Sequence, residues 1–168
     1  MMRGVQAHYH LEVRDMPTKV MIVEDEGLFR DLLRVSLSAQ PTFEVVWVAT
    51  DGSSAVSMAR DLTPDVIVMD IDLGKGPTGI EAGICIKETQ PAVGIVLLSS
   101  HKDKEYLSAI PTDQAAGWSY LLKQSLADLG ALTRALDGAV AGLVVLDPEL
   151  VMALRPRPPT SVGHPAAR

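Results

Sequence analysis

The stretch Val66-Ile67-Val68-Met69-Asp70-Ile71-Asp72-Leu73 decides the fold, because its apolar run ends abruptly in carboxylates. Four apolar residues in succession, with no polar alternation, are typical of a strand that is buried on both faces in a parallel sheet. A second such run, Val20-Met21-Ile22-Val23, ends in Glu24-Asp25-Glu26. Together the two stretches predict a parallel sheet with acidic groups along one edge.

Strands and helices alternate outward from these stretches. We predict strands over residues 19–23, 43–49, 65–69, 93–98 and 118–122. Apolar residues at helical spacing predict helices over 27–39, 51–60, 80–90 and 126–140, with a weak polar helix at 102–110. Asp51 is a good N-cap, and Ser125 to Asp128 form a capping-box pattern. This order predicts an α/β fold, a doubly wound five-stranded parallel sheet between two helical layers.

Composition divides the chain into three segments. Residues 1–17 are an N-terminal extension that we expect to be flexible, and residues 18–141 form the domain. Residues 142–168 become rich in proline and arginine and read as a linker or tail. Within that segment, residues 142–154 are open to two interpretations, a short strand with a helical turn or the start of the linker.

Charge and cysteine content exclude several classes of function. The chain has 168 residues and a formal net charge of −6, which is unfavourable for direct binding to a nucleic acid backbone. Its one cysteine, Cys85, supports neither a disulfide framework nor a thiolate zinc site and is expected to pack on the buried side of its helix. No apolar run is long enough to cross a membrane, so we expect a cytoplasmic protein without membrane contact.

Polar side chains follow four of the predicted strands. The first strand ends in Glu24-Asp25, the third in Asp70, the fourth in Ser99 and the fifth in Lys123. In a doubly wound sheet these ends meet at one edge, where ligands bind. Crowded carboxylates repel one another unless a cation screens them, and Mg²⁺ prefers such oxygen ligands. The set suits phosphoryl transfer, with an aspartate as the nucleophile that becomes an acyl phosphate.

These residues, in this order, resemble the receiver domain of bacterial two-component response regulators. Four motifs carry the resemblance: Val20 to Glu26, Val66 to Leu73, Val96 to Ser100, and Tyr120 to Lys123. They cover roughly residues 18–140 and imply a flavodoxin-like (βα)₅ fold. The Tyr-Leu-Leu-Lys ending is similar to the subfamily that usually carries a LuxR-type helix-turn-helix output, so the chain is expected to be a receiver, which in a longer chain would belong to a transcription regulator.

The resemblance implies a role for each matching residue. Asp70 matches the phosphoacceptor, Lys123 the invariant lysine and Ser99 the switch hydroxyl, while Tyr120 matches the aromatic residue that moves with that hydroxyl. A sensor histidine kinase or phosphotransfer protein is the implied donor. The implied output is a surface formed by the fourth helix, fifth strand and fifth helix, which is also the expected homodimer surface. Such a domain performs phosphotransfer to itself and autodephosphorylation and is not otherwise an enzyme.

The resemblance also implies the metal ligands. Asp25, Asp70 and the backbone carbonyl of Asp72 match positions that bind Mg²⁺ or Mn²⁺, with Glu24 acting through water. Asp72 and His101 flank the expected phosphate site, and their side chains either influence attack by water on the acyl phosphate or are simply exposed polar residues.

This sequence departs from the family pattern in two places within the domain. Gly74 stands where proline is usual, in a loop to Gly79 that is one residue longer, and residues 102–116 lack the usual helix-to-strand pattern. No helix-turn-helix follows residue 154, so the chain is either a single-domain regulator or a receiver cut from a longer protein.

The residues allow three other interpretations. The first is a degenerate receiver that binds partners without phosphorylation. The second is a phosphohydrolase of the haloacid dehalogenase type, because Asp70-Ile71-Asp72 resembles its nucleophile motif, although there the motif is on the first strand. The third is dinucleotide binding through the glycine pattern of residues 74–79, which is disfavoured because the next strand ends in Ser99-Ser100 instead of an acidic residue.

Overall fold

The fold is a single parallel sheet, seen in a computed structural model that describes residues 16–102 and 105–154. Its strands are β1 (Thr18–Val23), β2 (Phe43–Ala49), β3 (Val66–Asp70), β4 (Gly94–Ser99), β5 (Trp118–Leu122) and β6 (Val145–Leu146). They pair in the order β2-β1-β3-β4-β5-β6, and every pair is parallel. The five predicted strands are confirmed, and a sixth is added beside β5.

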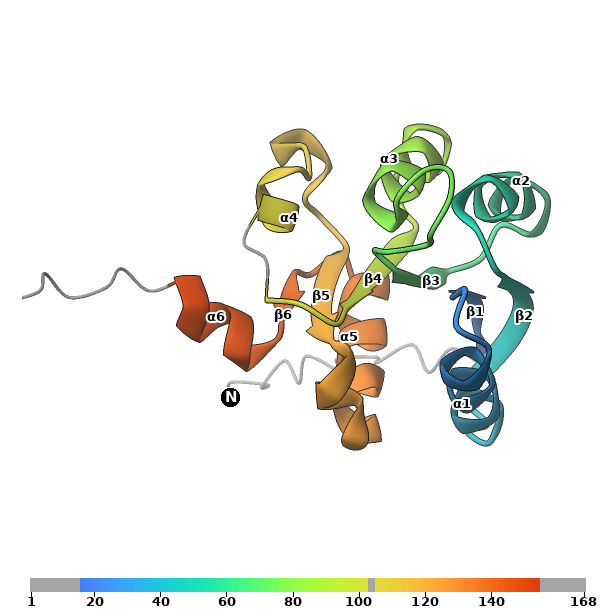
Figure 1. The fold of residues 1–168 in the computed structure, drawn as a ribbon. Coiled ribbons are helices and arrows are strands. Elements are labelled where there is room, and N and C mark those ends of the chain that lie inside the picture. Colours follow the sequence, from blue (N-terminus) through green and yellow to red (C-terminus); the bar gives the residue numbers. More distant parts are fainter. Residues whose placement is uncertain (1–15, 103–104, 155–168) are drawn as a thin grey trace, which may run out of the picture.

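Helices cover both faces of this sheet (Figure 1). They are α1 (Gly27–Ser38), α2 (Gly52–Leu62), α3 (Gly79–Thr89), α4 (Glu105–Ser108), α5 (Leu129–Val140) and α6 (Pro148–Leu154), with 3₁₀ helices η1 (Thr112–Gln114) and η2 (Lys123–Ala127). Helices α2 and α3 lie on one face and α1 and α5 on the other, which confirms the predicted three layers. Within residues 16–102 and 105–154, no helix combines the length and apolarity needed to cross a membrane.

The core has two halves, one on each face of the sheet. Ile67 and Met69 of β3 point into the half covered by α2 and α3, whereas Val66 and Val68 point into the half covered by α1 and α5. Successive side chains of a strand alternate between faces, so a strand covered on both sides must be apolar at every position. This is why the run from Val66 to Met69 has no polar residue until Asp70.

Helix boundaries match the prediction at α2 and differ at α4 and α5. The Asp51 side chain accepts a hydrogen bond from the Ser54 amide at 2.8 Å and caps α2 as expected. Helix α5 begins at Leu129, because residues 123–127 form η2 and Asp128 is the N-cap, so the capping box predicted at Ser125 is wrong. Aspartate is itself a strong N-cap, and Asp128 caps the helix three residues later than predicted. Helix α4 is a single turn.

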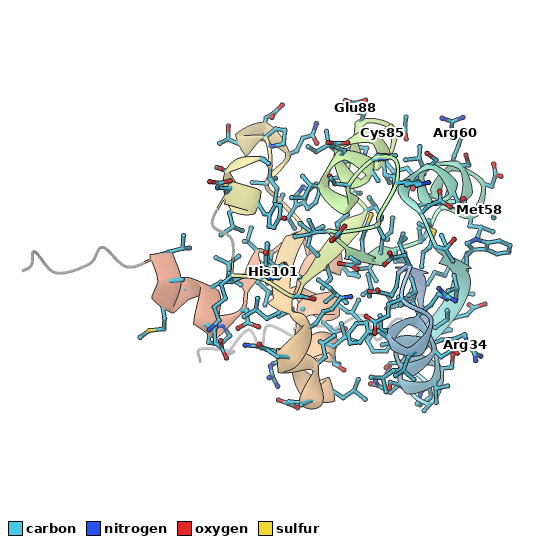
Figure 2. All side chains as sticks on the ribbon, in the orientation of Figure 1. Arg34, Met58, Arg60, Cys85, Glu88 and His101 are labelled. Carbon is cyan, nitrogen blue, oxygen red and sulfur yellow. The ribbon has the colours of Figure 1, made fainter. Side chains whose placement is uncertain are left out.

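Cys85 is exposed, so the prediction that it packs on the buried side of its helix is wrong. Figure 2 shows Cys85 and Glu88 on the outer side of α3. The face of α3 that meets the sheet is made by Ala82, Gly83, Ile86 and the aliphatic part of Lys87. Ile80 and Ile86 are buried on this face, and Cys85 lies outside it.

Residues 142–154 continue the fold instead of leaving it. Strand β6 pairs with β5, with Tyr120 opposite Leu146, and Leu150 of α6 is 1% exposed. Asp147, between β6 and α6, is fully buried, and its carboxylate accepts a hydrogen bond from the Leu122 amide at 3.1 Å. Of the two interpretations left open for this segment, the short strand with a helical turn is the one observed.

Candidate functional site

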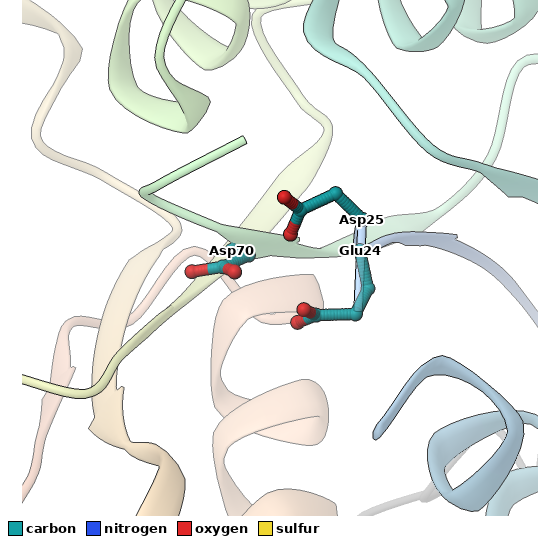
Figure 3. A group of neighbouring side chains, drawn as sticks. All are labelled: Glu24, Asp25 and Asp70. Atoms are coloured by element: carbon teal, nitrogen blue, oxygen red, sulfur yellow. The ribbon is translucent and has the colours of Figure 1, made fainter. Parts of the chain in front are cut away.

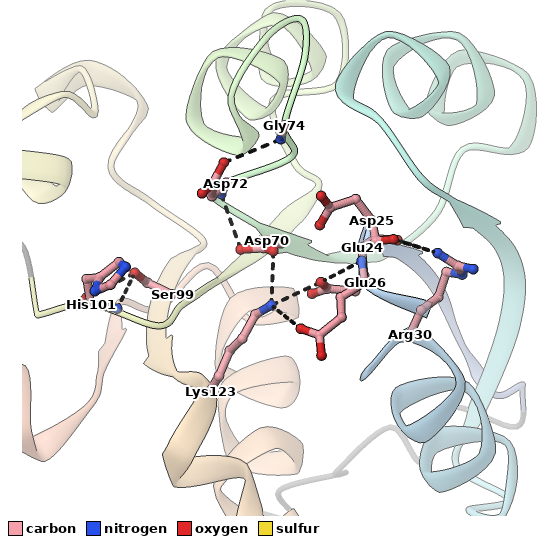
Figure 4. Close-up of polar contacts among 10 residues, drawn as sticks. All are labelled: Glu24, Asp25, Glu26, Arg30, Asp70, Asp72, Gly74, Ser99, His101 and Lys123. Atoms are coloured by element: carbon pink, nitrogen blue, oxygen red, sulfur yellow. Dashed lines mark hydrogen bonds and ion pairs between the residues drawn. The ribbon is translucent and has the colours of Figure 1, made fainter. Parts of the chain in front are cut away.

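The carboxyl ends of β1, β3 and β5 bring the predicted acidic and basic residues together (Figure 4). Glu24 and Asp25 directly follow β1, Asp70 is the last residue of β3, and Lys123 directly follows β5. Parallel strands place these positions at the same edge because all of them run in one direction. The sequence order of the strands therefore explains how residues up to 99 positions apart meet.

Three carboxylates form the acidic part of the site. Oxygen atoms of Glu24, Asp25 and Asp70 all lie within 4.8 Å of one another. In Figure 3 the three side chains point toward a shared space above the end of the sheet. Glu24 is fully buried and Asp70 is 5% exposed, whereas Asp25 is exposed. The cluster is thus open to solvent on the Asp25 side and closed on the Glu24 side.

Lys123 provides the counter-charge to the cluster. Its Nζ atom lies 3.0 Å from Glu24 Oε1 and 3.0 Å from Asp70 Oδ2, and 3.9 Å from Glu26 Oε2. The same ammonium group lies 4.6 Å from the centre of the Phe29 ring, a distance suited to a cation–π contact. One ammonium thus joins two buried carboxylates.

The balance of burial and charge shifts two pKa values in this group. Burial raises the pKa of Glu24 to about 7, and the charge of Asp70 adds to this, although the hydrogen bond and the charge of Lys123 act in the opposite direction. For Lys123, burial lowers the pKa, but the hydrogen bonds and charges of Glu24 and Asp70 together outweigh burial, so its pKa is raised. Lys123 is therefore a permanent cation, whereas Glu24 sits near its titration point at neutral pH.

The acidic cluster has the donor set for a hard divalent cation. Glu24 Oε2 is buried and has no hydrogen-bond partner among the described residues, so one carboxylate oxygen is available to a cation or to its water. Asp25 presents its carboxylate to solvent nearby. Carboxylate oxygens with access to water are what Mg²⁺ requires, so the residues present fit this ion.

The loop after β3 is held by two short-range hydrogen bonds (Figure 4). Asp70 Oδ1 accepts from the Asp72 amide at 3.2 Å, and Asp72 Oδ1 accepts from the Gly74 amide at 3.3 Å. Gly74 has φ = +74°, which proline cannot adopt because its ring fixes φ near −65°. The glycine in place of the usual proline therefore gives this loop a different path without removing a chemical group.

The two predicted switch residues meet at one backbone carbonyl. The buried Ser99 hydroxyl donates to the His101 carbonyl oxygen at 2.9 Å and accepts from the His101 amide at 3.0 Å. The Tyr120 hydroxyl donates to the same carbonyl oxygen at 3.2 Å, and Tyr120 is 1% exposed. Sequence reasoning connected Ser99 with Tyr120 but missed the His101 backbone that joins them.

Two further features of the site escaped the sequence analysis. Arg30 Nη1 donates to the carbonyl oxygens of Glu24 and Asp25, both at 3.1 Å, and so fixes the backbone of the acidic pair. Its position in the first turn of α1, five residues after Asp25, was the available signal. A cavity of about 250 Å³ opens beside Asp70, and its lining includes Tyr106 as well as the predicted residues Ser99, His101 and Lys123.

Comparison with known proteins agrees with this geometry. The family model for the response regulator receiver domain matches residues 20–137. The transcriptional regulatory protein DegU of Brevibacillus brevis is 34% identical over 139 residues, covering 83% of this chain and 57% of DegU. The transcriptional regulatory protein LiaR of Bacillus subtilis (strain 168) is 36% identical over 137 residues, covering 76% of this chain and 63% of LiaR.

A solved structure of a response regulator has the same fold. The crystal structure of a LuxR-family two-component response regulator from Aurantimonas sp. SI85-9A1 superposes with a TM-score of 0.71 at 30% identity, covering 81% of this chain and 94% of that one. The chain spans about three fifths of the two curated relatives that it matches. It belongs to the response regulator receiver domain family, and is a signalling domain homologous to the receivers of transcriptional regulators.

Proposed function

We propose that this receiver accepts a phosphoryl group on Asp70 from the phosphohistidine of a sensor kinase or phosphotransfer protein. The observation that carries the proposal is the position of Lys123, 3.0 Å from Asp70 and 3.0 Å from Glu24 at the end of the sheet. An ammonium beside the nucleophile and a cluster that fits a divalent cation supply the positive charge that phosphoryl transfer needs.

The transfer converts one high-energy bond into another. An Asp70 carboxylate oxygen attacks phosphorus, the phosphorus–nitrogen bond of phosphohistidine breaks, and the imidazole leaves with the electron pair. We propose that Asp25, Asp70 and the Asp72 carbonyl hold Mg²⁺ or Mn²⁺, with Glu24 acting through water. When bound, the cation neutralises charge on the phosphoryl oxygens.

The protein's own residues do the remaining work. Lys123 offsets the charge of a second phosphoryl oxygen, and Ser99 donates its hydroxyl proton to a third. That proton is now donated to the His101 carbonyl, so Ser99 must leave this carbonyl to serve the phosphoryl group. Tyr120, which shares the carbonyl, is the residue we expect to respond.

The product remains on the chain, which distinguishes this activity from turnover. Autodephosphorylation by water resets Asp70, and we propose no other catalysis. We expect phosphorylation and dephosphorylation to take place in the cytoplasm, because a chain with a single cysteine is suited to a reducing compartment. Because the matched relatives are transcriptional regulators, we propose that the output is transcriptional, with dimerisation through α4, β5 and α5 and without direct nucleic acid contact by residues 18–141.

Labelling with acetyl phosphate and Mg²⁺ tests the proposal. Asp70→Asn is expected to abolish the mass increase of one phosphoryl group, because an amide is a poor nucleophile, while the circular dichroism spectrum stays unchanged. Asp61→Asn, the same change at an exposed position of α2, is the matched control and should label normally. Full labelling of Asp70→Asn would refute the assignment, and repeated hydrolysis of phosphomonoesters by the unaltered protein would favour the phosphohydrolase.

A further inference from the structure

Helix α6 contacts the loop after β4 and the 3₁₀ helix η2, which both border the proposed phosphorylation site. Glu149 Oε2 lies 2.5 Å from the Nζ atom of Lys102, and it accepts a hydrogen bond from Gln124 Nε2 at 3.0 Å. Lys102 directly follows His101 in the loop after β4, and Gln124 directly follows Lys123 after β5. One carboxylate therefore joins the loop that carries the switch carbonyl to η2, which begins at the site lysine.

The base of α6 is attached to β5 by a separate set of contacts. The Asp147 amide donates to the Tyr120 carbonyl at 2.8 Å, and the Asp147 carboxylate accepts from the amides of Leu122 and Glu149. Asp147 is fully buried, and Leu150 is 1% exposed. These contacts hold β6 and the first turn of α6 on the sheet without any involvement of the Glu149 side chain.

Helix α6 is too short to be stable without such contacts. It has seven residues, Pro148 to Leu154, whereas isolated helices below about 12–15 residues are marginal in water. Val151, Met152 and Leu154 are exposed, so beyond Leu150 little apolar burial supports the second turn. Besides the capping contacts of Asp147, the contact of Glu149 with Lys102 and Gln124 is a polar support that the structure shows for this helix.

The switch step removes part of that support. If Ser99 donates its proton to a phosphoryl oxygen, the two hydrogen bonds that close the turn between Ser99 and His101 are lost together. The backbone of His101, the residue immediately before Lys102, is then no longer held by Ser99. Lys123 already lies 3.0 Å from Asp70, so its neighbour Gln124 need not move. The partner of Glu149 that follows a rearranged residue is therefore Lys102.

We propose that α6 is a latch that reads the phosphorylation state of Asp70. In the form described here, Glu149 holds Lys102 and Gln124 and keeps α6 folded. Phosphorylation draws Ser99 toward the site, breaks the contact of Glu149 with Lys102 and loosens α6 beyond Leu150, while Asp147 keeps β6 in place. The inference rests on the proposed function, because it takes phosphorylation of Asp70 as the trigger.

Reciprocity sets the size of the effect. If the Glu149 contacts exist only in the unphosphorylated form, then removing them must favour the phosphorylated form by the same factor. The side chains of Lys102 and Glu149 are 52% and 46% exposed, and such half-exposed pairs contribute little. We therefore expect Glu149→Gln to tighten binding of the phosphoryl analogue by about 1.5-fold to fivefold.

Hydrogen exchange of the intact chain tests the latch, with beryllofluoride and Mg²⁺ in place of the phosphoryl group. Fluorine NMR reports whether beryllofluoride is bound, and mass spectrometry reports the exchange of amides 151–154. We expect exchange in this segment to rise about 1.5-fold to fivefold on binding, whereas amides of β6 change little. Glu149→Gln and Lys102→Met should each raise exchange before any beryllofluoride is added, and Glu88→Gln on the outer side of α3 should not (Figure 2).

The outcomes separate this inference from the proposed function. If beryllofluoride binds but exchange in α6 is unchanged, the latch is refuted and the phosphoacceptor role stands. If Glu149→Gln exchanges like the unaltered chain, the Glu149 contacts do not hold α6, and the latch is refuted as well. If beryllofluoride does not bind, the proposed function fails and takes the latch with it.

Discussion

A buried lysine and a partly buried one lie at opposite ends of β5 and have opposite electrostatic surroundings. Lys87 of α3 is 4% exposed, and its ammonium donates to the carbonyl oxygens of Pro91 at 3.2 Å and Ala116 at 2.8 Å, just before β5 begins. Lys123 directly follows β5 and faces carboxylates. Burial lowers the pKa of Lys87, whereas the pKa of Lys123 is raised because its carboxylate partners outweigh the effect of burial.

The difference separates a structural lysine from a functional one. Neutral carbonyls can satisfy an ammonium's hydrogen bonds but leave its charge uncompensated, so Lys87 fastens the end of α3 to the loop before β5 and does little else. At the other end, Glu24, Asp25 and Asp70 oppose a single ammonium, which leaves excess negative charge. That excess negative charge favours binding of a divalent cation. The cation and Lys123 together then offset the negative charge of a phosphoryl group.

Removing each lysine should separate the two roles, and this is the largest effect we expect. Lys123→Met is predicted to slow labelling by acetyl phosphate about a hundredfold, the usual cost of losing one donor to developing anionic charge. Lys87→Met should label within about twofold of the unaltered chain, but its free energy of unfolding should fall by about 1–2 kcal/mol because two partly buried carbonyl oxygens lose their donor. Urea denaturation and timed mass spectrometry provide the two measurements.

The reverse pattern would break the comparison. If Lys87→Met lost labelling while Lys123→Met kept it, the amine at the amino-terminal edge of β5 would be the functional one. Loss of labelling in both variants without loss of stability would mean that the two ends of β5 are coupled.

The site that contains Lys123 should also depend on pH near neutrality. Glu24 has a pKa of about 7 in the folded chain against a reference value of 4.5. Its contribution to stability is fully present below pH 4.5, where both states hold the proton. It is lost as pH rises toward 7, because only the unfolded chain releases that proton, a loss on the order of 3 kcal/mol. Denaturation in EDTA at several pH values checks this.

Magnesium binding should have the opposite pH dependence from stability. The cation competes with the proton on Glu24, so calorimetry should show about a tenfold tighter apparent affinity at pH 8 than at pH 6. Glu24→Gln removes the competing proton and should flatten this dependence, whereas Lys87→Met should leave it intact. A flat profile in the unaltered chain would show that Glu24 is ionised throughout the range.

The parts of the fold that local pattern determines were predictable from the sequence. The run from Val66 to Asp70 shows its burial on both faces directly, because each apolar residue in it faces one half of the core. The convergence of Asp70 with Lys123 followed from strand order alone. The strand pattern already placed these residues at one edge of the sheet, and the resemblance to receiver domains then implied the role of each.

The rest depended on contacts that no local pattern records. Lys87 is buried because its ammonium donates hydrogen bonds to the carbonyl oxygens of Pro91 and Ala116, and Ala116 lies 29 positions away. Cys85, on the same helix, is exposed. Residues 145–154 join the sheet because Asp147 finds the Leu122 amide, a pairing across 25 positions. The three-way contact of Ser99, Tyr120 and the His101 backbone is likewise a product of packing.

The smallest expected effect is on the half-life of phosphorylated Asp70, and it tests whether the functional edge, meaning the carboxyl-terminal edge of the sheet around Asp70, includes exposed residues as well as buried ones. Asp72 and His101 are exposed and line the cavity beside Asp70. Each can accept a proton from water that attacks the acyl phosphate, so Asp72→Ala and His101→Ala are expected to lengthen the half-life of phosphorylated Asp70. Exposed groups rarely contribute more than about 1 kcal/mol, which limits the change to about two- to fivefold.

Asp72 Oδ1 already accepts from the Gly74 amide, so its effect should be the smaller of the two. Half-lives that match the unaltered chain in both variants would mean that the functional edge ends at the residues in contact with Lys123, and that Asp72 and His101 are ordinary exposed polar residues.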